Sequence, residues 1–323
     1  NGACVGSIIL NSPLSISSSD VAMFIYVSES GCEGISGIEI PGGTIVNSFV
    51  TFDIFVPISD SFLLGAVIYS DFFVDPSSTV LMHTNITHFS TGYDFRAGVI
   101  LESATIDAEG GIFEIYSLID GPDAGTAFAI FNCTIINVLM EATFTNPDYG
   151  EIYGFDIAES FLKTCSIASS FNIDGSYEGL SNIVFDGNII LTECAISSEI
   201  SGNFGNVVAI RFYDTAYVSM QDSNVYSIVY SDFNAIAIGF SSNVDVFSNN
   251  IISGEVVTSN IGDSNYGVII DSLSFNLTDI NFIEGYVSGV PCTDFCTGLI
   301  VESGSFIAET DTTLNLVGIT ESG

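Results

Sequence analysis

Acidic residues recur along this sequence at intervals of about 29 residues, a period in the range of repeat architectures. Asp156, Asp186 and Asp214 follow one another at this interval, each directly after a short apolar run. Two carboxyl groups held on either side of a glycosidic bond can act as acid and base in its cleavage. If the three residues share one face, they are the fallback candidates for a polysaccharide hydrolase or lyase. Polyanionic substrates would be repelled by the surrounding acidic chain.

The same spacing has two non-catalytic interpretations. Stacked carboxylates could share Ca²⁺, which takes six to eight oxygen ligands; the candidates are Asp71, Glu102, Asp156, Asp186, Asp271 and Glu302. Alternatively, Asp, Asn and Ser end strands because their side chains bond the backbone at turns. Asn132 and Ser241 fall in the same series and favour this structural interpretation. No cofactor is required, and Ca²⁺ stays an open alternative.

The histidines are the other group with chemical potential. His83 and His88 lie between Asp75 and Arg96, together with Tyr93 and Asp94. A metal site needs a third ligand at the correct distance, and the spacing alone does not supply one. The sequence contains no Gly-x-Ser-x-Gly, Walker, Cys-x-x-Cys or His-Glu-x-x-His motif. We therefore predict a protein that is not an enzyme.

The regular interval predicts the fold. Such repeats are typical of solenoids, and the runs between the acidic residues alternate in polarity, as in Val208, Ile210 and Phe212. Connections between parallel strands are right-handed. We expect an all-β, single-stranded right-handed parallel β-helix of about eleven coils with roughly 29 residues per coil. Residues 1–323 form one domain in this prediction: 1–36 an N-terminal coil or cap, 37–313 the central coils and 314–323 a terminal strand.

A second series tests the register of the first. Cys165, Cys194, Ser223, Asn249 and Thr278 recur at nearly the same interval as the acidic residues. The offset between the two series varies little, which predicts that the coils from Asp156 onward share one template. In the same register, Ile210, Ile238 and Ile270 are expected to stack inward in successive coils.

Short motifs carry a resemblance to known families. Phe185-Asp186-Gly187-Asn188 and Phe247-Ser248-Asn249-Asn250 resemble the Phe-x-x-Asn repeats of polymorphic outer-membrane-protein-type surface proteins. Val208-Ala209-Ile210 and Ile236-Ala237-Ile238 resemble their Gly-Gly-Ala-Ile element without its glycine pair. Most of the chain resembles the pectin-lyase-like right-handed parallel β-helix superfamily. The resemblance implies the fold and no functional residue, because the Gly-His-Gly and Arg-Ile-Lys segments of the galacturonase type are absent.

Composition restricts the partners. The chain has 39 acidic and 3 basic residues, Arg96, Lys163 and Arg211, and a formal charge of −36. Nucleic acid is excluded as a partner because its binding depends on basic contacts to phosphate. Anionic lipid surfaces are disfavoured for the same reason. No apolar run is long enough to span a membrane.

Sequons and cysteines indicate a secreted or cell-surface protein. Asn85, Asn132 and Asn276 each begin an acceptor sequence for N-glycosylation. The disulfide candidates are Cys4 with Cys32, Cys165 with Cys194, and Cys292 with Cys296; Cys133 is left over. The first two pairs are each separated by one coil, which is within the reach of a disulfide. The alternative for Cys165 and Cys194 is an inward stack of reduced thiols.

These features predict a non-catalytic extracellular structural protein. Strand-like sequence lies at both ends, Ser7–Leu10 and Leu314–Val317, without an amphipathic capping helix. Open coil ends expose unpaired backbone, so either further chain or another subunit would cover them. We therefore expect a filament, sheath or appendage subunit whose main partner is another copy of itself, with neighbouring or attached glycans as other partners. The alternative is a monomeric surface adhesin or glycan-binding β-helix, which should expose a row of aromatic side chains on one face.

Overall fold

The computed structural model describes most of the chain as β-strand and turn. The described residues are 8–26, 35–57, 63–87, 96–108, 110–121, 125–145, 152–177, 180–204, 206–213, 217–231, 234–258, 264–289, 296–308 and 311–320. The chain divides into two compact units, Asn1–Ile167 (unit 1) and Ala168–Gly323 (unit 2). The prediction of one domain over 1–323 stays a prediction.

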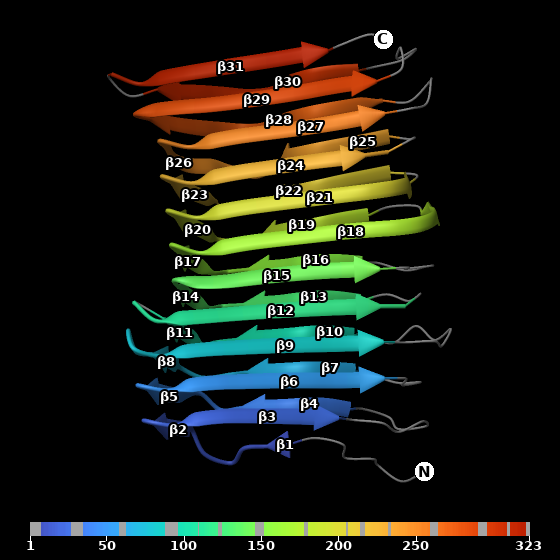
Figure 1. The fold of residues 1–323 in the computed structure, drawn as a ribbon. Helices are drawn as coiled ribbons and strands as arrows, with labels where there is room; N and C mark the ends of the chain where they lie inside the picture. Colours follow the sequence, from blue (N-terminus) through green and yellow to red (C-terminus); the bar gives the residue numbers. More distant parts are fainter. Residues whose placement is uncertain are drawn as a thin grey trace. The chain divides into compact units, whose positions relative to one another are not determined.

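Unit 1 repeats a set of three strands, here called the first, second and third strand of each turn (Figure 1). Its first strands are β1 (Ile8–Ile9), β4 (Ile35–Ile40), β7 (Leu63–Ile68), β10 (Arg96–Glu102), β13 (Gly125–Phe131) and β16 (Ile152–Ala158). Its second strands are β2 (Leu14–Ser17), β5 (Gly43–Val46), β8 (Phe72–Val74), β11 (Thr105–Asp107), β14 (Thr134–Ile136) and β17 (Phe161–Lys163). Its third strands are β3 (Asp20–Tyr26), β6 (Phe49–Pro57), β9 (Thr79–Thr87), β12 (Ile112–Asp120) and β15 (Val138–Thr145).

Unit 2 has the same order of strands. Its first and second strands are β19 (Leu180–Asp186), β20 (Ile189–Thr192), β22 (Asn206–Tyr213), β23 (Val218–Gln221), β25 (Asn234–Phe240) and β26 (Val244–Ser248). In the later turns the two merge into the long strands β28 (Asn265–Thr278) and β30 (Cys296–Ala308). The third strands are β18 (Ser166–Tyr177), which begins at the unit boundary, β21 (Ala195–Phe204), β24 (Asn224–Tyr230), β27 (Ile251–Thr258), β29 (Ile280–Gly289) and β31 (Thr313–Thr320).

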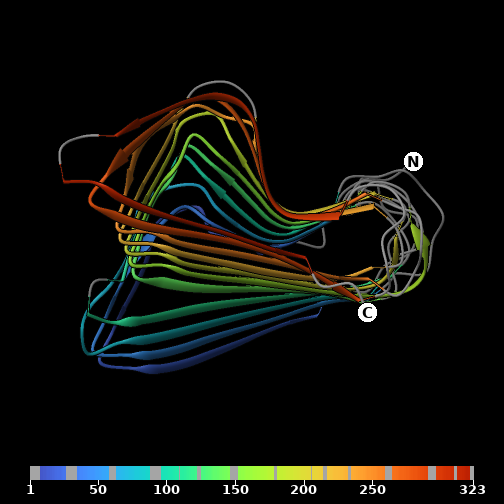
Figure 2. The ribbon, with the colours of Figure 1, turned by 90° about the horizontal axis from the view of Figure 1, so that it is seen from above.

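Strands of the same kind pair in parallel from turn to turn. In unit 1, β9 pairs with β6 on one side and with β12 on the other; in unit 2, β24 pairs with β21 and β27. Viewed along the stack, strands of successive turns lie over one another within each unit (Figure 2). An all-β parallel β-solenoid with about 29 residues per turn is therefore confirmed. The handedness and the count of eleven coils stay predictions.

Apolar side chains stack in columns inside the solenoid. Phe185, Phe212 and Phe240 form a run of parallel rings with centroid separations of 4.7 and 4.5 Å. Ile210 pairs with Ile238 as expected, and both are buried. Ile238 then pairs with Val268, while Ile270 pairs with Phe240. The prediction that Ile270 continues the isoleucine column was therefore wrong, because the connection before β28 is longer than the preceding one.

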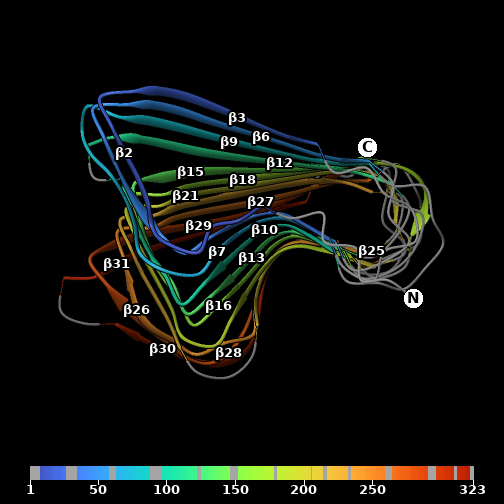
Figure 3. The same ribbon diagram turned by 90° about the horizontal axis from the view of Figure 1, so that it is seen from below.

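The first strands contain two consecutive inward residues, which interrupts their alternation. β16 and β19, for example, bury two neighbouring residues near their middle. Since alternate residues of a strand point to opposite faces, two buried neighbours mean that the strand bends there. Figure 3 shows such bends in first strands of unit 1, including β10 and β13.

The first residue of each buried pair belongs to a column that we call the small-residue column. In unit 1 it consists of Gly37, Gly65, Gly98, Ala127 and Gly154. In unit 2 it consists of Asn182, Ala209, Ala237, Gly267 and Gly298. The Ala209 and Ala237 elements identified in the sequence are members of this column. Small residues are needed because the third strands pass directly opposite.

The third strands contribute a facing column. Its members are Ile54, Thr84, Ser117 and Ala142 in unit 1, and Ser169, Ser198, Ser227, Gly254, Gly285 and Gly318 in unit 2. A Cβ added at Gly98 would collide with Ser117 Oγ and lie 2.8 Å from the Ala127 carbonyl oxygen. A Cβ at Gly267 would lie 2.8 Å from the Gly254 carbonyl oxygen. The two columns therefore approach closely in both units.

Asn182 is the exception in size, and it is fully buried. Its side-chain amide donates to Ser198 Oγ at 2.7 Å and to the Ser169 carbonyl oxygen at 3.2 Å, and Ser169 Oγ donates to its Oδ1. Hydrogen bonds to both neighbouring third strands satisfy a polar group that would otherwise destabilise the interior. The larger side chain is accommodated because the facing residues are serines.

Ladders of polar side chains mark the corner between the second and third strands. In unit 2 the Cys194 N–H donates to Ser223 Oγ at 3.1 Å, the Ser223 N–H to Asn250 Oδ1 at 3.0 Å, and the Asn250 N–H to Asn281 Oδ1 at 3.0 Å. The sequence series had placed Asn249 and Thr278 at these positions, which was wrong. Asn249 has a φ of +53° and turns the chain one residue earlier, a conformation that Asn tolerates.

Unit 1 has the same corner ladder. The Ser19 N–H donates to Ser48 Oγ and the Ser48 N–H donates to Ser78 Oγ, each at 3.2 Å. Ser18 and Asn47, the residues directly before Ser19 and Ser48, have positive φ. These side chains satisfy backbone groups that leave the sheets at the corner. Ser, Asn and Asp residues that recur once per turn therefore carry much of the periodic signal in the sequence.

The close approach of the two columns gives a direct test. We expect Gly98→Ala to destabilise the protein by about 2 kcal/mol, because the added methyl overpacks a closed interface. The matched control is Gly239→Ala, where an added Cβ meets its nearest atoms at 3.6 and 3.8 Å and should change stability by less than about 0.5 kcal/mol. Urea unfolding followed by circular dichroism measures both midpoints. The double variant Gly98→Ala, Ser117→Gly should recover part of the loss; equal midpoints for Gly98→Ala and Gly239→Ala would contradict the interpretation.

Candidate functional site

The acidic series does not form one continuous ladder among the described residues. Asp156 pairs with Ala129, and Glu102 pairs with Phe131. Asp186 pairs with Tyr213, and Asp271 pairs with Ser303 across a register shift. Asp214 lies outside the described residues. The prediction of a single column was wrong for these residues, because turns of unequal length convert a nearly constant sequence interval into different registers.

Two members of the series bond the backbone at turns. Asp71 Oδ1 accepts a hydrogen bond from the Thr105 N–H at 3.0 Å, and Asp186 Oδ1 accepts one from the Gly187 N–H at 2.7 Å. These contacts agree with the structural interpretation of the series. No group of three or more His, Cys, Asp or Glu side chains suited to a metal ion occurs in the described part of the chain. Calcium binding and acid–base catalysis by the series stay predictions without support from the register.

The described cysteines are mostly free and buried. Cys133, Cys165 and Cys194 carry free thiols, so the prediction of a disulfide between Cys165 and Cys194 was wrong and the alternative of reduced thiols is the observed state. Cys165 and Cys194 follow the turning residues Thr164 and Glu193, with φ of +54° and +55°, and so occupy the buried corner position. Burial raises the pKa of the Cys133 thiol, which disfavours the reactive thiolate.

The remaining cysteines do not test the predicted pairs. Cys296 is disulfide-bonded. Cys4, Cys32 and Cys292 lie outside the described residues, so the pairs Cys4–Cys32 and Cys292–Cys296 stay predictions. His88, Tyr93 and Asp94, which were expected to accompany His83, also lie outside them.

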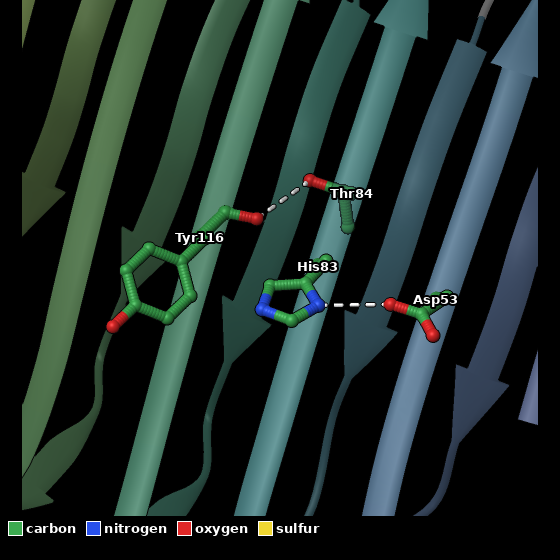
Figure 4. A network of polar contacts seen from close by, with 4 residues as sticks. All are labelled: Asp53, His83, Thr84 and Tyr116. Carbon is green, nitrogen blue, oxygen red and sulfur yellow. Dashed lines mark hydrogen bonds and ion pairs between the residues drawn. The ribbon is translucent and has the colours of Figure 1, made fainter. Parts of the chain in front are cut away.

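The best-defined polar cluster lies on the outward face of the third strands of unit 1. His83 Nδ1 lies 2.8 Å from Asp53 Oδ1, and both side chains are about half exposed, at 45% and 49% (Figure 4). Strand pairing places them side by side, since Asp53 on β6 is the register partner of His83 on β9. His83 was identified in the sequence with other neighbours; Asp53 was missed, although it lies one turn earlier in the chain.

Tyr116 and Glu114 extend this cluster on the next strand. The rings of His83 and Tyr116 are 5.3 Å apart, and Tyr116 is the register partner of His83. The Tyr116 hydroxyl donates to Glu114 Oε2 at 2.8 Å. This hydrogen bond, with smaller contributions from partial burial and the charges of Glu114 and Glu141, raises the pKa of Tyr116 to about 12. The only sequence signal for this pair is the i, i+2 spacing that puts both side chains on one face.

Aromatic side chains lie beside the polar cluster on the same face. Phe24, on β3, is the register partner of Asp53, and its side chain is 73% exposed. Tyr26 and Phe55 occupy the next outward position, with stacked rings 5.4 Å apart. Exposed aromatic groups on one face were the feature expected of an adhesin. Their position next to Asp53 and His83 combines apolar surface with directional polar groups.

A different surface lies on the last described turn of unit 2. Val301 occupies the inward column of Ile270 and is 41% exposed, whereas Ile270 is 1% exposed. Leu316 occupies the inward column of Ile283 and is 44% exposed, whereas Ile283 is fully buried. β31 pairs with β29 and ends the sheet order, and it includes no charged side chain. Apolar core positions and a backbone edge are therefore uncovered together.

The three sequon asparagines differ in accessibility. Asn132 is exposed at a corner with a φ of +53°. Asn85 is half-buried on β9, where its Oδ1 accepts a hydrogen bond from Thr87. Asn276 lies on β28 and has its Oδ1 buried without a partner. Asn132 is the site best placed for a glycan, and glycosylation itself stays a prediction.

Comparisons with known proteins add no name. No protein-family model, curated protein or solved structure matches the chain. The resemblance to the pectin-lyase-like superfamily and to outer-membrane-type surface repeats therefore stays a prediction. The described residues include no helix that could cross a membrane.

The Tyr116–Glu114 pair predicts a specific titration. We expect Glu114→Gln to lower the pKa of Tyr116 from about 12, because the accepting carboxylate and its charge are removed. Ultraviolet absorbance of ionised tyrosine measures it, with Tyr116→Phe subtracted to isolate this residue. A raised pKa means that the folded protein retains a proton that the unfolded chain loses near pH 10, so this contribution to stability is lost as pH rises through the range 10 to 12. An unchanged titration in Glu114→Gln would contradict the assigned hydrogen bond.

The buried thiols predict a labelling pattern. Without reductant, iodoacetamide should leave Cys133, Cys165 and Cys194 unmodified in the folded protein and label all three after unfolding in guanidinium. Peptide mapping by mass spectrometry identifies each residue. A disulfide between Cys165 and Cys194, or labelling of either in the folded protein, would show that the assigned buried state is wrong.

Proposed function

We propose that this protein is a non-catalytic structural subunit of an extracellular filament, sheath or appendage that assembles through the ends of its solenoid. The observation that carries the proposal is the uncovered surface of β30 and β31, where Val301 and Leu316 lie exposed in columns that are buried one turn earlier. Burying an aliphatic side chain contributes about 1.5–3 kcal/mol, so this surface favours a partner that continues the columns.

A second copy of the chain is the partner that the charges favour. The chain carries a formal charge of −36, so two copies repel each other over most orientations. β31 has no charged side chain, and neither has β1 or β2 of the first described turn of unit 1. Ile8 on β1 is exposed although its register partner Ile38 is buried. Contact between these two uncharged surfaces is heterologous, and such contacts propagate into filaments.

The finer features of the prediction support the same function. A single-stranded right-handed β-helix of about eleven coils would be a rod of roughly 50 Å at a rise of about 4.8 Å per coil. Secretion is supported by the sequons, of which Asn132 is exposed at a corner. Ca²⁺ bound to surface carboxylates would reduce repulsion between copies.

Two alternatives have weaker support. The monomeric adhesin is favoured by the exposed aromatic groups around Phe24 and Tyr26, which a filament subunit does not require. A polysaccharide hydrolase or lyase is disfavoured because Asp156 and Asp186 do not share a register with acidic neighbours among the described pairs.

Assembly should depend on concentration, salt and the last turn. We expect the protein to form filaments above a critical concentration that falls as salt screens the charge repulsion. Leu316→Asp should raise this concentration at least about tenfold, since it places a charge in the contact. Analytical ultracentrifugation and negative-stain microscopy of native-length protein measure both effects.

The matched control is Ile251→Asp, a change of the same type at an exposed outward position of β27. It should leave the critical concentration within about twofold of the original. A monodisperse monomer at high concentration and salt would mean that the filament proposal is wrong, including the case in which further chain covers β31.

A further inference from the structure

We propose that the outward face around Asp53 in unit 1 is a binding site for a neutral saccharide. The site, called the Asp53 surface, consists of Phe24, Tyr26, Asp53, Phe55 and His83. It is separate from the uncovered turn of unit 2 and does not depend on filament formation.

Strand register determines the layout of the Asp53 surface. Phe24, Asp53 and His83 occupy one outward column on β3, β6 and β9. Tyr26 and Phe55 occupy the next outward column, two residues further along β3 and β6. Neighbouring strands are about 4.8 Å apart and outward residues of one strand about 7 Å apart. The five side chains therefore cover an area that matches one or two sugar rings.

Asp53 and His83 supply directional hydrogen bonds. Asp53 Oδ1 is held by His83 Nδ1 at 2.8 Å, which fixes both side chains. Among the described residues no protein partner is recorded for Asp53 Oδ2 or His83 Nε2. One acceptor and one ring nitrogen thus face solvent side by side. Adjacent hydroxyl groups of a sugar are both donors and acceptors, so they can bond this pair together.

The aromatic side chains supply the apolar part of the site. Phe24 is 73% exposed next to Asp53, and the Tyr26 and Phe55 rings are stacked 5.4 Å apart. The C–H face of a sugar ring packs on an aromatic ring while its hydroxyls bond polar neighbours. Large rigid rings contribute contact area with little loss of conformational entropy. A continuous apolar partner would leave Asp53 without hydrogen bonds, which is unfavourable.

The charge of the surface selects neutral ligands. None of the five third strands of unit 1, β3, β6, β9, β12 and β15, contains Lys or Arg. Glu114, Asp120 and Glu141 lie on the same set of strands. An anionic saccharide would be repelled and would find no basic partner. A second copy of this chain is disfavoured for the same reason.

The test is a titration of native-length protein with a panel of hexasaccharides. The neutral members are cellohexaose, maltohexaose, xylohexaose and N-acetylchitohexaose; hexagalacturonate is the anionic member and hexalysine tests a cationic peptide. Calorimetry measures affinity, and NMR follows the His83 imidazole signals, assigned with His83→Gln. We expect at least one neutral member to bind and to shift the His83 signals.

Variants separate the site from other surfaces. Asp53→Ala and Phe24→Ala should each weaken binding about tenfold. Phe49→Ala, an exposed phenylalanine on β6 outside the site, is the matched control and should change affinity less than about twofold. Circular dichroism establishes that each variant is folded; if one of the two site variants fails to fold, Asp53→Asn takes its place and should also weaken binding. Leu316→Asp should bind as the unmodified protein does, whether or not filaments form.

Three results would overturn the proposal. The first is no binding of any neutral member up to about 10 mM, the weak end of specific affinities. The second is equal affinity of Asp53→Ala, Phe24→Ala and Phe49→Ala. The third is preferred binding of hexagalacturonate or hexalysine, which would assign the surface to an anionic glycan or a basic peptide.

Discussion

The close approach of the small-residue column to the facing column is the constraint on which the rest of the structure depends. At Gly98 and Ser117 there is no space for one more methyl group, and at Asn182 the larger side chain fits because Ser169 and Ser198 face it with hydrogen bonds. Size is therefore shared between the two columns. The first strand bends at this point in each turn, and its two consecutive inward residues follow from the bend.

This constraint also holds the outward face of the third strands. Each facing residue points inward, so its neighbours in the strand must point outward. Ile54 and Thr84 are buried against the first strands, and the residues directly before them are Asp53 and His83. The ion pair thus exists because two neighbouring inward residues fix the register of β6 and β9. The Asp53 surface is a consequence of core packing as much as of its own interactions.

The sequence predicted the fold better than it predicted the columns. A period averaged over many turns was sufficient for a parallel solenoid, because alternation and corner residues recur in every turn. Individual columns require the length of every turn, and these lengths vary: the chain from Thr79 to its partner Ile112 is much longer than the chain from Phe113 to its partner Val138. A mean interval therefore placed Asp156 beside Asn132 when its partner is Ala129. The Asn250–Asn281 ladder was missed for the same reason, although the predicted positions lay close by in the sequence.

Repetition would link the two proposed properties. A flat saccharide site such as the Asp53 surface buries little of its ligand, so the affinity of one copy is expected to be low. Copies joined at the ends of the solenoid would repeat the surface at regular intervals along a filament. A long neutral polysaccharide could then contact several copies at once, and avidity would exceed the affinity of one site without any new contact. The high negative charge favours this arrangement, because it opposes lateral association of filaments and so leaves their faces open.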